Sequence, residues 1–398
     1  MKRTASFLLA IVMAFLVPSA AYATDYDVAA EEAPAVTAAA QFSAEGIDAV
    51  SAILTEQSTG RVLFEYNADE ALPPASVTKT MTMLLVMEAI DGGLIKLDDV
   101  VTVSENAASM GGSQVYLEAG EQMDVGTLLK CMTVASANDA AVALAEHISG
   151  SEATFVDKMN ARAAELGCTA TTFENATGLD DTTTNHAMSA RDIAKISAEI
   201  LKHPKILEYT TIWMDTIRNG EFGLTNTNRL IRFYDGATGL KTGSTAKAKF
   251  CISATAERNG LSLIAVVMGS STRDARNALA KEMLDFGFAN YACFKKDVSD
   301  TGKVQVKGGV SPLVGTTGNA FSAVVDKADA GKVEETVEMP EYVAAPIKSG
   351  DKIGTLTYKI GDDVVGTADI VAAQDVDKIS YFTLLPKIFR WFIMAPES

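Results

Sequence analysis

The sequence has few residues of the kinds that bind metals or cross-link small domains. Its four cysteines lie far apart and form no Cys-x-x-Cys pair, which argues against a dense disulfide scaffold and favours free thiols. The three histidines have no metal-ligand spacing, so we expect neither a metal nor another cofactor. Positive charge is also scarce: 34 Lys and Arg against 51 Asp and Glu give a net charge of −17, which argues against a nucleic-acid partner.

The N-terminus carries an apolar run that is too short to span a membrane. Lys2 and Arg3 precede the apolar residues 7–17, and Ala21-Tyr22-Ala23 places small residues where a signal peptidase cuts. This pattern predicts a secretory signal peptide over residues 1–23, with a buried N-terminal helix as the alternative. The composition of residues 24–42, rich in Ala, Glu, Asp and Pro, predicts a flexible lead-in.

Residues 43–292 predict a mixed α/β domain. Residues 77–91 are helical and apolar on every face, so this helix belongs in the middle of a core. Strand patterns occur at both ends of the domain, at residues 49–54, 61–66, 250–255 and 261–268, and helical patterns lie at 124–135, 139–149, 152–166, 190–202 and 273–288. This order predicts one mixed sheet with a helical lobe inserted into it.

Beyond Cys293 the sequence has short alternating segments separated by glycines, which predict a separate small all-β domain over residues 293–376. Residues 377–398 form the tail. Within it, residues 381–394 mix aromatic, apolar and cationic side chains, which predicts an amphipathic helix that lies flat on a membrane surface. The alternative is a helix docked on the β domain, and Pro386 is expected to break or kink either helix.

Ser76 and Lys79 open the predicted buried helix. Side chains three positions apart on a helix are neighbours, so the Lys79 amine can reach the Ser76 hydroxyl. The helix N-terminus favours a developing alkoxide, and a lysine in a dry site beside another cation can lose its proton near neutral pH. The pair therefore predicts a serine nucleophile activated by a lysine, although Ser-x-x-Lys alone is a weak signal.

Two further segments are ambiguous when each is taken alone. Ser136-Ala137-Asn138 lies between two predicted helices and is best explained as the N-cap of the second, although Ser136 could relay a proton to a leaving amine and Asn138 could hold a substrate amide. Lys241-Thr242-Gly243 begins a predicted strand. Lys241 and Thr242 could bind a carboxylate by charge-assisted hydrogen bonds, and Gly243 would let the substrate backbone approach the strand closely. The alternative is a glycine-rich turn with a solvated lysine.

In combination and in this order, the three motifs resemble those of penicillin-binding proteins and serine β-lactamases. Over residues 43–292 the chain is similar to serine-type D-alanyl-D-alanine carboxypeptidases, the low-molecular-weight penicillin-binding proteins, and the β domain and tail match that family's layout. The segments that carry this likeness are Pro74–Lys79, Ser136–Ala140, Thr177–Leu179, Ser189–Asp192 and Gly239–Thr245. The resemblance implies a penicillin-binding-protein/β-lactamase-like transpeptidase fold, with an antiparallel sheet flanked by helices plus a helical lobe.

The resemblance also implies a role for each residue. Ser76 would attack the carbonyl between the two terminal D-alanines of a peptidoglycan stem peptide, and Lys79 would take its proton. Ser136 would pass a proton to the departing D-alanine, and Asn138 would orient the peptide. The N–H groups of Ser76 and Ser244 would form the oxyanion hole. Lys241 and Thr242 would hold the terminal carboxylate beside Gly243. Arg276 would assist, or be an ordinary surface charge.

At Ser244 the chain departs from the family pattern, where a larger residue such as His or Tyr is frequent; this departure alters the pocket rim but leaves the backbone N–H. The resemblance further implies β-lactams as inhibitors and an exported enzyme, at the extracytoplasmic face of the bacterial membrane or in the cell wall. Two alternatives stay open: a serine β-lactamase, for which we find no Glu-x-x-x-Asn segment between Asn138 and Lys241, and a non-catalytic penicillin-sensing or wall-binding protein.

Overall fold

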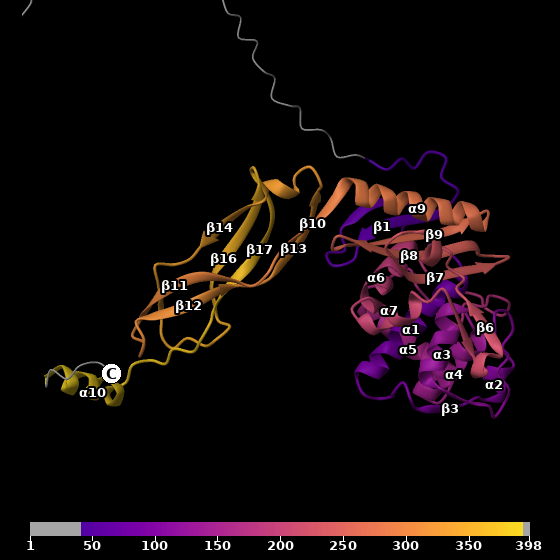
Figure 1. Cartoon of the computed structure of the whole chain (residues 1–398), viewed down its shortest axis with the longest axis horizontal. Helices are drawn as coiled ribbons and strands as arrows, with labels where there is room; N and C mark the ends of the chain where they lie inside the picture. The colour runs from indigo at the N-terminus through magenta and orange to yellow at the C-terminus, as the bar shows by residue number, and fades with distance from the viewer. Residues whose placement is uncertain (1–40, 393–398) are drawn as a thin grey trace, which may run out of the picture. The chain divides into compact units, whose positions relative to one another are not determined.

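The computed structural model describes residues 41–392 (Figure 1). The predicted signal peptide, and residues 24–40 of the predicted lead-in, lie outside the described residues. The described chain forms a sheet with helices on both faces, then a group of strands without long helices, and then one C-terminal helix.

The larger α/β part is built on a five-stranded antiparallel sheet with the order β2-β1-β9-β8-β7. Its strands are β1 (Ser51–Glu56), β2 (Val62–Tyr66), β7 (Ala237–Thr245), β8 (Lys249–Arg258) and β9 (Leu261–Ser270). Asn259 and Gly260 join β8 to β9, both with positive φ, as the Asn-Gly hairpin signal predicts. Strands from the two ends of this part thus meet in one sheet, with β7 at its edge.

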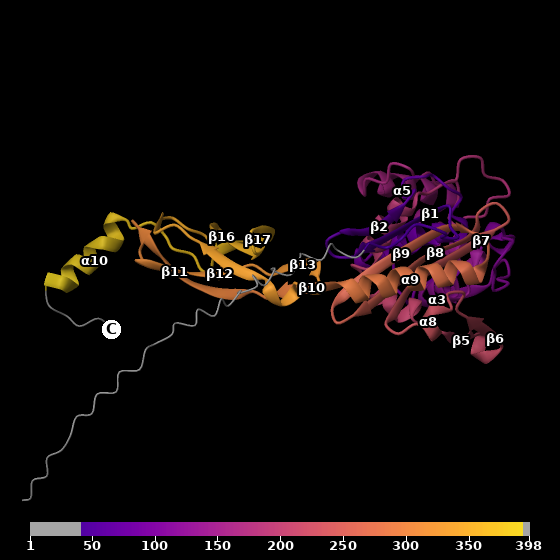
Figure 2. The same ribbon diagram turned by 90° about the horizontal axis from the view of Figure 1, so that it is seen from above.

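Side chains of β9 alternate between two cores, as the period of a strand requires. Ile264, Val266 and Met268 pack on the helical-lobe side. On the other face Leu263, Ala265 and Val267 pack under one long helix, α9 (Arg273–Asn290). Figures 1 and 2 show α9 running along the sheet on the face away from the lobe.

The lobe surrounds α1 (Lys79–Asp91), which follows a single 3-10 turn, η1 (Ala75–Thr78). The other helices and turns are α2 (Glu105–Ala108), α3 (Val125–Val134), α4 (Asn138–Ser149), α5 (Glu152–Glu165), α6 (Ala190–Ile200), η2 (Pro204–Ile206), α7 (Leu207–Thr210), η3 (Arg218–Gly220) and α8 (Leu230–Phe233). Two small hairpins complete it, β3 (Val100–Thr102) with β4 (Gln122–Asp124), and β5 (Met214–Ile217) with β6 (Phe222–Thr225). Helix α1 is largely buried against α3, α4, α5 and α6, which confirms the central position predicted from its apolar sequence.

The β-rich part contains a six-stranded sheet with the order β14-β16-β17-β12-β11-β15 and the antiparallel pair β10–β13. Its strands are β10 (Tyr291–Lys296), β11 (Ser299–Lys307), β12 (Leu313–Gly318), β13 (Phe321–Asp326), β14 (Glu334–Glu338), β15 (Tyr342–Ala344), β16 (Lys352–Ile360) and β17 (Asp363–Ala372), with a short turn η4 (Ala330–Lys332). Phe321 stacks on Tyr358 with ring centroids 4.4 Å apart, so aromatic packing anchors part of this small core.

The last element is α10 (Tyr381–Phe392), which contains Pro386. The break expected at Pro386 is absent. A proline within a helix leaves one carbonyl of the preceding turn, here that of Phe382, without an intrahelical donor. That turn is exposed, so water can bind the carbonyl. None of the helices in the described part of the chain is both long and apolar enough to cross a membrane.

Candidate active site

Ser76 lies in the first helical turn of the buried α1 segment, where the sheet meets the lobe. Its side chain is half-buried, whereas Lys79, three residues later, is fully buried. Lys79 Nζ lies 3.0 Å from Ser76 Oγ. The structure therefore brings together the pair that the helical spacing predicted.

Lys79 has two further hydrogen-bond acceptors. Its Nζ donates to Asn138 Oδ1 at 2.6 Å and to the Thr177 carbonyl oxygen at 2.9 Å. Burial, and next the positive charge of Lys241, lower the pKa of Lys79 well below its usual value, against an opposing effect of Asp139. Because burial removes water from the charged form, the neutral amine becomes accessible at a far lower pH than in solution.

Asn138 and Ser136 lie where the lobe faces Ser76. The helix cap that Ser136-Ala137-Asn138 favoured when taken alone is wrong: Ala137 is the N-cap of α4, and it makes no side-chain cap. Asn138 instead bonds Lys79, and its Nδ2 donates to the Gly111 carbonyl at 2.7 Å. Ser136 has φ 62°, in a sparsely populated region of backbone conformation, and residues held there cluster at active sites and ligand contacts.

A tight backbone approach holds the Thr177 carbonyl in place. Gly178 has φ +82°, and a Cβ there would lie 1.8 Å from the Ala75 carbonyl oxygen. Ala75 itself has φ 49°. Glycine at position 178 is thus required twice, by its conformation and by contact with the turn that bears Ser76.

The edge strand β7 forms the opposite wall. A Cβ on Gly243 would lie 2.7 Å from the Pro74 carbonyl and 2.9 Å from the Ser76 nitrogen, so only glycine lets β7 approach this turn so closely. Thr242 Oγ1 donates to Thr227 Oγ1 at 2.7 Å. Thr242, Gly243 and the exposed Ser244 line a pocket together with Ser76.

Lys241 is 1% exposed, so the alternative of a solvated lysine in a turn is wrong. Its Nζ donates to the Thr242 carbonyl oxygen at 2.8 Å. Burial, followed by the charge of Arg276, lowers the pKa of Lys241 to about 7.

Arg276 is likewise not a surface charge. It is 2% exposed, and its guanidinium donates to the Cys251 carbonyl and to Asn277 Oδ1. Burial lowers the pKa of Arg276 to about 10. Arg276 lines the same pocket as Thr242, so a group that is cationic at neutral pH stands at its wall.

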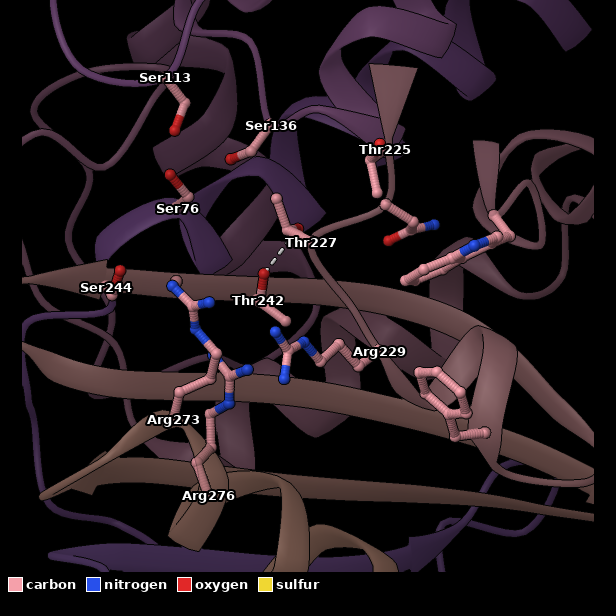
Figure 3. Close-up of a pocket in the computed structure, with 14 residues that line it drawn as sticks. Ser76, Ser113, Ser136, Thr225, Thr227, Arg229, Thr242, Ser244, Arg273 and Arg276 are labelled. Carbon is pink, nitrogen blue, oxygen red and sulfur yellow. Dashed lines mark hydrogen bonds between the residues drawn. The ribbon is translucent and has the colours of Figure 1, made fainter. Parts of the chain in front are cut away.

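The pocket has a volume of about 670 Å³, a typical size for a small-molecule site. Figure 3 shows the hydroxyls of Ser76, Ser113 and Ser136 facing one another across it. Arg229 and Arg273 also line it, and the described residues at its wall include no Asp or Glu. In a chain with a net charge of −17, this concentration of arginines favours an anionic ligand.

Sequence reasoning missed several of these residues. Ser113, Arg229 and Arg273 carry no local motif. Their side chains reach the pocket because separate segments of the chain converge there, namely the segment around Ser113, the N-terminus of α8 and the N-terminus of α9.

His186, which has no metal-ligand spacing in the sequence, links two segments of the lobe. It accepts from the Glu174 N–H at Nδ1 and lies 2.7 Å from Thr78 Oγ1 at Nε2. Thr78 belongs to the turn that carries Ser76, so His186 ties the 174–186 loop to that turn. Burial lowers the pKa of His186 to about 4.

Comparison with known proteins agrees with this geometry. The sequence profile of the family described as D-alanyl-D-alanine carboxypeptidase matches residues 36–272, and that of the penicillin-binding protein 5 C-terminal domain matches residues 289–378. The chain is 44% identical over 348 residues to D-alanyl-D-alanine carboxypeptidase DacF of Bacillus subtilis, covering 85% of this chain and 89% of the relative. It is 31% identical to DacC of Escherichia coli, covering 90% and 94%.

Solved structures show the same likeness. Penicillin-binding protein 5 of Haemophilus influenzae superposes with a TM-score of 0.74 at 31% identity, over 85% of this chain and all of that one. Ampicillin-bound penicillin-binding protein D2 of Listeria monocytogenes superposes with a TM-score of 0.56 at 32% identity, over 61% and 99%. By sequence and by fold, the chain belongs to the D-alanyl-D-alanine carboxypeptidase family.

Proposed function

We propose that this protein removes the terminal D-alanine from peptidoglycan stem peptides that end in D-Ala-D-Ala, through an acyl-enzyme on Ser76. The observation that carries the proposal is the contact of Lys79 Nζ with Ser76 Oγ, at 3.0 Å, at the wall of a pocket that is lined by arginines and has no carboxylate among its described wall residues.

Acylation begins with proton transfer from Ser76 to neutral Lys79. A neutral amine keeps two N–H groups, which Asn138 Oδ1 and the Thr177 carbonyl accept. Its lone pair then points at the Ser76 hydroxyl, which is the arrangement a general base requires. The backbone N–H groups of Ser76 and Ser244 face the developing oxyanion, a contribution of a few kcal/mol.

Collapse of the tetrahedral intermediate breaks the bond to the terminal D-alanine. Ser136 lines the pocket beside Ser76 and passes the proton held by Lys79 to the departing amine. Thr242 and Arg276 bind the terminal carboxylate by charge-assisted hydrogen bonds. Lys241, buried behind Thr242, adds positive potential, and Gly243 allows the close approach of β7. Water then hydrolyses the acyl-enzyme.

The same site reacts with β-lactams, whose carboxylate and strained amide resemble the end of the peptide. A rapid β-lactamase needs a general base that activates water on the acyl-enzyme. The described pocket wall offers no Asp or Glu for that task, which supports a long-lived adduct.

The test is release of D-alanine from a pentapeptide, measured beside labelling by a fluorescent penicillin. Wild type is expected to release D-alanine and to form an adduct at Ser76, and Ser76→Ala to do neither. Absence of release from folded wild-type protein that still binds penicillin would favour a sensor. Fast turnover of penicillin would favour a β-lactamase.

The domain organisation belongs to the same proposal: a signal peptide (1–23), a lead-in (24–42), the enzyme domain (43–292), a β domain (293–376) and a tail (377–398). Export to the outer face of the bacterial membrane follows from the N-terminal pattern. Exposed aromatic and apolar side chains of α10, among them Phe382 at 83% and Phe389 at 66% exposure, support binding to a membrane surface.

Deleting residues 379–394 is expected to release the protein from membranes while pentapeptide hydrolysis persists. Sedimentation with lipid vesicles measures the first effect and D-alanine release the second. If the truncated protein still sediments with vesicles, the proposed role of the tail in membrane binding is wrong.

A further inference from the structure

The pocket extends past the place where the substrate should end. Positions along strand β7 indicate how far the site extends. Gly243 lies against the Ser76 nitrogen, and Thr242, one residue earlier in the chain, lies at the proposed carboxylate site. Gly239 lies four residues back along the strand, about 13 Å from Gly243 by the usual rise. Its carbonyl accepts a hydrogen bond of 2.7 Å from Asn228 Nδ2. The segment that follows Asn228 therefore lies at the end of the site away from Ser76.

This far end has an aromatic wall. Phe233 closes α8, just after Asn228, and Trp213 precedes β5. Their rings meet edge to face with centroids 6.0 Å apart, and both residues line the pocket. Phe233 is 71% exposed. An exposed aromatic side chain at the wall of a pocket is typical of a ligand contact.

The peptide backbone cannot occupy this end, because the chain terminates at the carboxylate. Only the side chain of the carboxyl-terminal residue can extend there, and the methyl group of alanine is too short to fill it. Arg229 also lines this part of the pocket. In Figure 3 the Arg229 guanidinium points back toward Thr242, so its charge adds to the carboxylate site. The wall farthest from Ser76 is then formed by Trp213 and Phe233.

We propose that Trp213 and Phe233 form a subsite for the side chain of the terminal residue, and that this subsite accepts apolar and aromatic side chains larger than methyl. This inference rests on the proposed function. The reaction is unchanged: the amide bond breaks, water supplies hydroxyl to the acyl group, and the departing D-amino acid takes the proton on its amine. The enzyme should then trim D-residues other than alanine.

The test compares three pentapeptides that differ only in their ends, D-Ala-D-Ala, D-Ala-D-Phe and D-Ala-D-Glu, with the full chain and with kcat/KM for release of the last residue as readout. We expect comparable values for the D-Ala and D-Phe peptides and a lower value for the D-Glu peptide. Phe233→Ala and Trp213→Ala should each lower the ratio of the D-Phe to the D-Ala value by about tenfold, because apolar contacts are lost.

The matched control is Tyr342→Ala, which removes an exposed aromatic side chain of β15 and should keep the wild-type ratio. Phe233 is exposed, so its truncation should not unfold the protein. If D-alanine is released but D-Phe is rejected, if D-Glu is preferred to D-Phe, or if both variants keep the wild-type ratio, the subsite is overturned. Failure to release even D-alanine overturns the proposed function itself.

Discussion

Lys79 Nζ lies 3.0 Å from Ser76 Oγ and divides its other hydrogen bonds between Asn138 Oδ1 and the Thr177 carbonyl oxygen. Both of these partners are acceptors. A neutral Lys79 satisfies both with its two N–H groups and has its lone pair left for Ser76. This arrangement supports the proposed role of Lys79 as the base that takes the Ser76 proton.

Lys79→Arg should abolish acylation, because arginine keeps its charge and cannot accept the Ser76 proton. We expect the rate of labelling by fluorescent penicillin to fall by about 10³-fold or more, the scale of losing a general base together with its positioning. Stopped-flow or gel-based labelling measures this rate. Near-wild-type labelling by the Arg variant would show that Lys79 is not the base.

Lys241→Gln should change both limbs of the pH profile of kcat/KM, which reports the free enzyme. Wild-type activity should fall as pH rises through about 7, where Lys241 loses its charge. The variant should lose this limb. Its acidic limb should move to higher pH, because the Lys241 charge lowers the pKa of Lys79.

Below pH 7 the variant should also bind the substrate carboxylate more weakly, because it lacks the positive potential that charged Lys241 adds behind Thr242. Steady-state hydrolysis of the pentapeptide from pH 5 to 10 measures all three effects. A variant whose profile parallels that of wild type would contradict them.

Gly178→Ala should destabilise the protein far more than Gly167→Ala. Both glycines have positive φ, but a Cβ at position 167 meets nothing within 4 Å, whereas one at position 178 would lie 1.8 Å from the Ala75 carbonyl oxygen. Conformation alone costs about 1–2 kcal/mol, and the clash adds about 1–3 kcal/mol.

Urea unfolding measures the two stabilities, and penicillin labelling should be slowed only in Gly178→Ala, because Thr177 would shift away from Lys79. Equal losses of unfolding free energy in the two variants would contradict this prediction, because they would mean that the backbone at Ala75 moves aside for the Cβ without destabilising the protein.

His186→Gln should weaken the dependence of the free energy of unfolding on pH below 6.5. Burial lowers the pKa of His186 from 6.5 to about 4 in the folded protein, so between these values the unfolded chain binds more protons. Stability is therefore lost as pH falls from 6.5 through 4. The variant cannot take up this proton, so its stability deficit relative to wild type should shrink over that range. Thermal unfolding at pH 7 and pH 4.5 gives the comparison, and a constant deficit would contradict it.

The sequence around each site was enough to predict the buried helix at residues 77–91, the Ser76–Lys79 pair and a strand at Lys241. Each of these features depends on residues that are neighbours in the chain. Local reasoning failed at Ser136–Asn138, where cap propensity favoured an N-cap. Asn138 instead bonds Lys79, 59 residues away in the chain. Local reasoning left Lys241 and Arg276 open between a functional and a solvent-exposed role, since charge predicts exposure unless a partner or a buried role is known.

What the sequence determined by itself is therefore the chemistry: a serine, a lysine at helical spacing, and a strand with a glycine. What only the tertiary structure decided is how reactive and how large the site is. The pKa of Lys79 falls because the packing of α1 removes water from its amine, and because the positive charge of Lys241 lies nearby. Residue spacing within one segment does not predict this desolvation, since it comes from segments that are distant in the chain. The pocket wall at Trp213, Arg229 and Phe233 likewise arises because two segments, the one before β5 and the one that carries α8, meet beside β7.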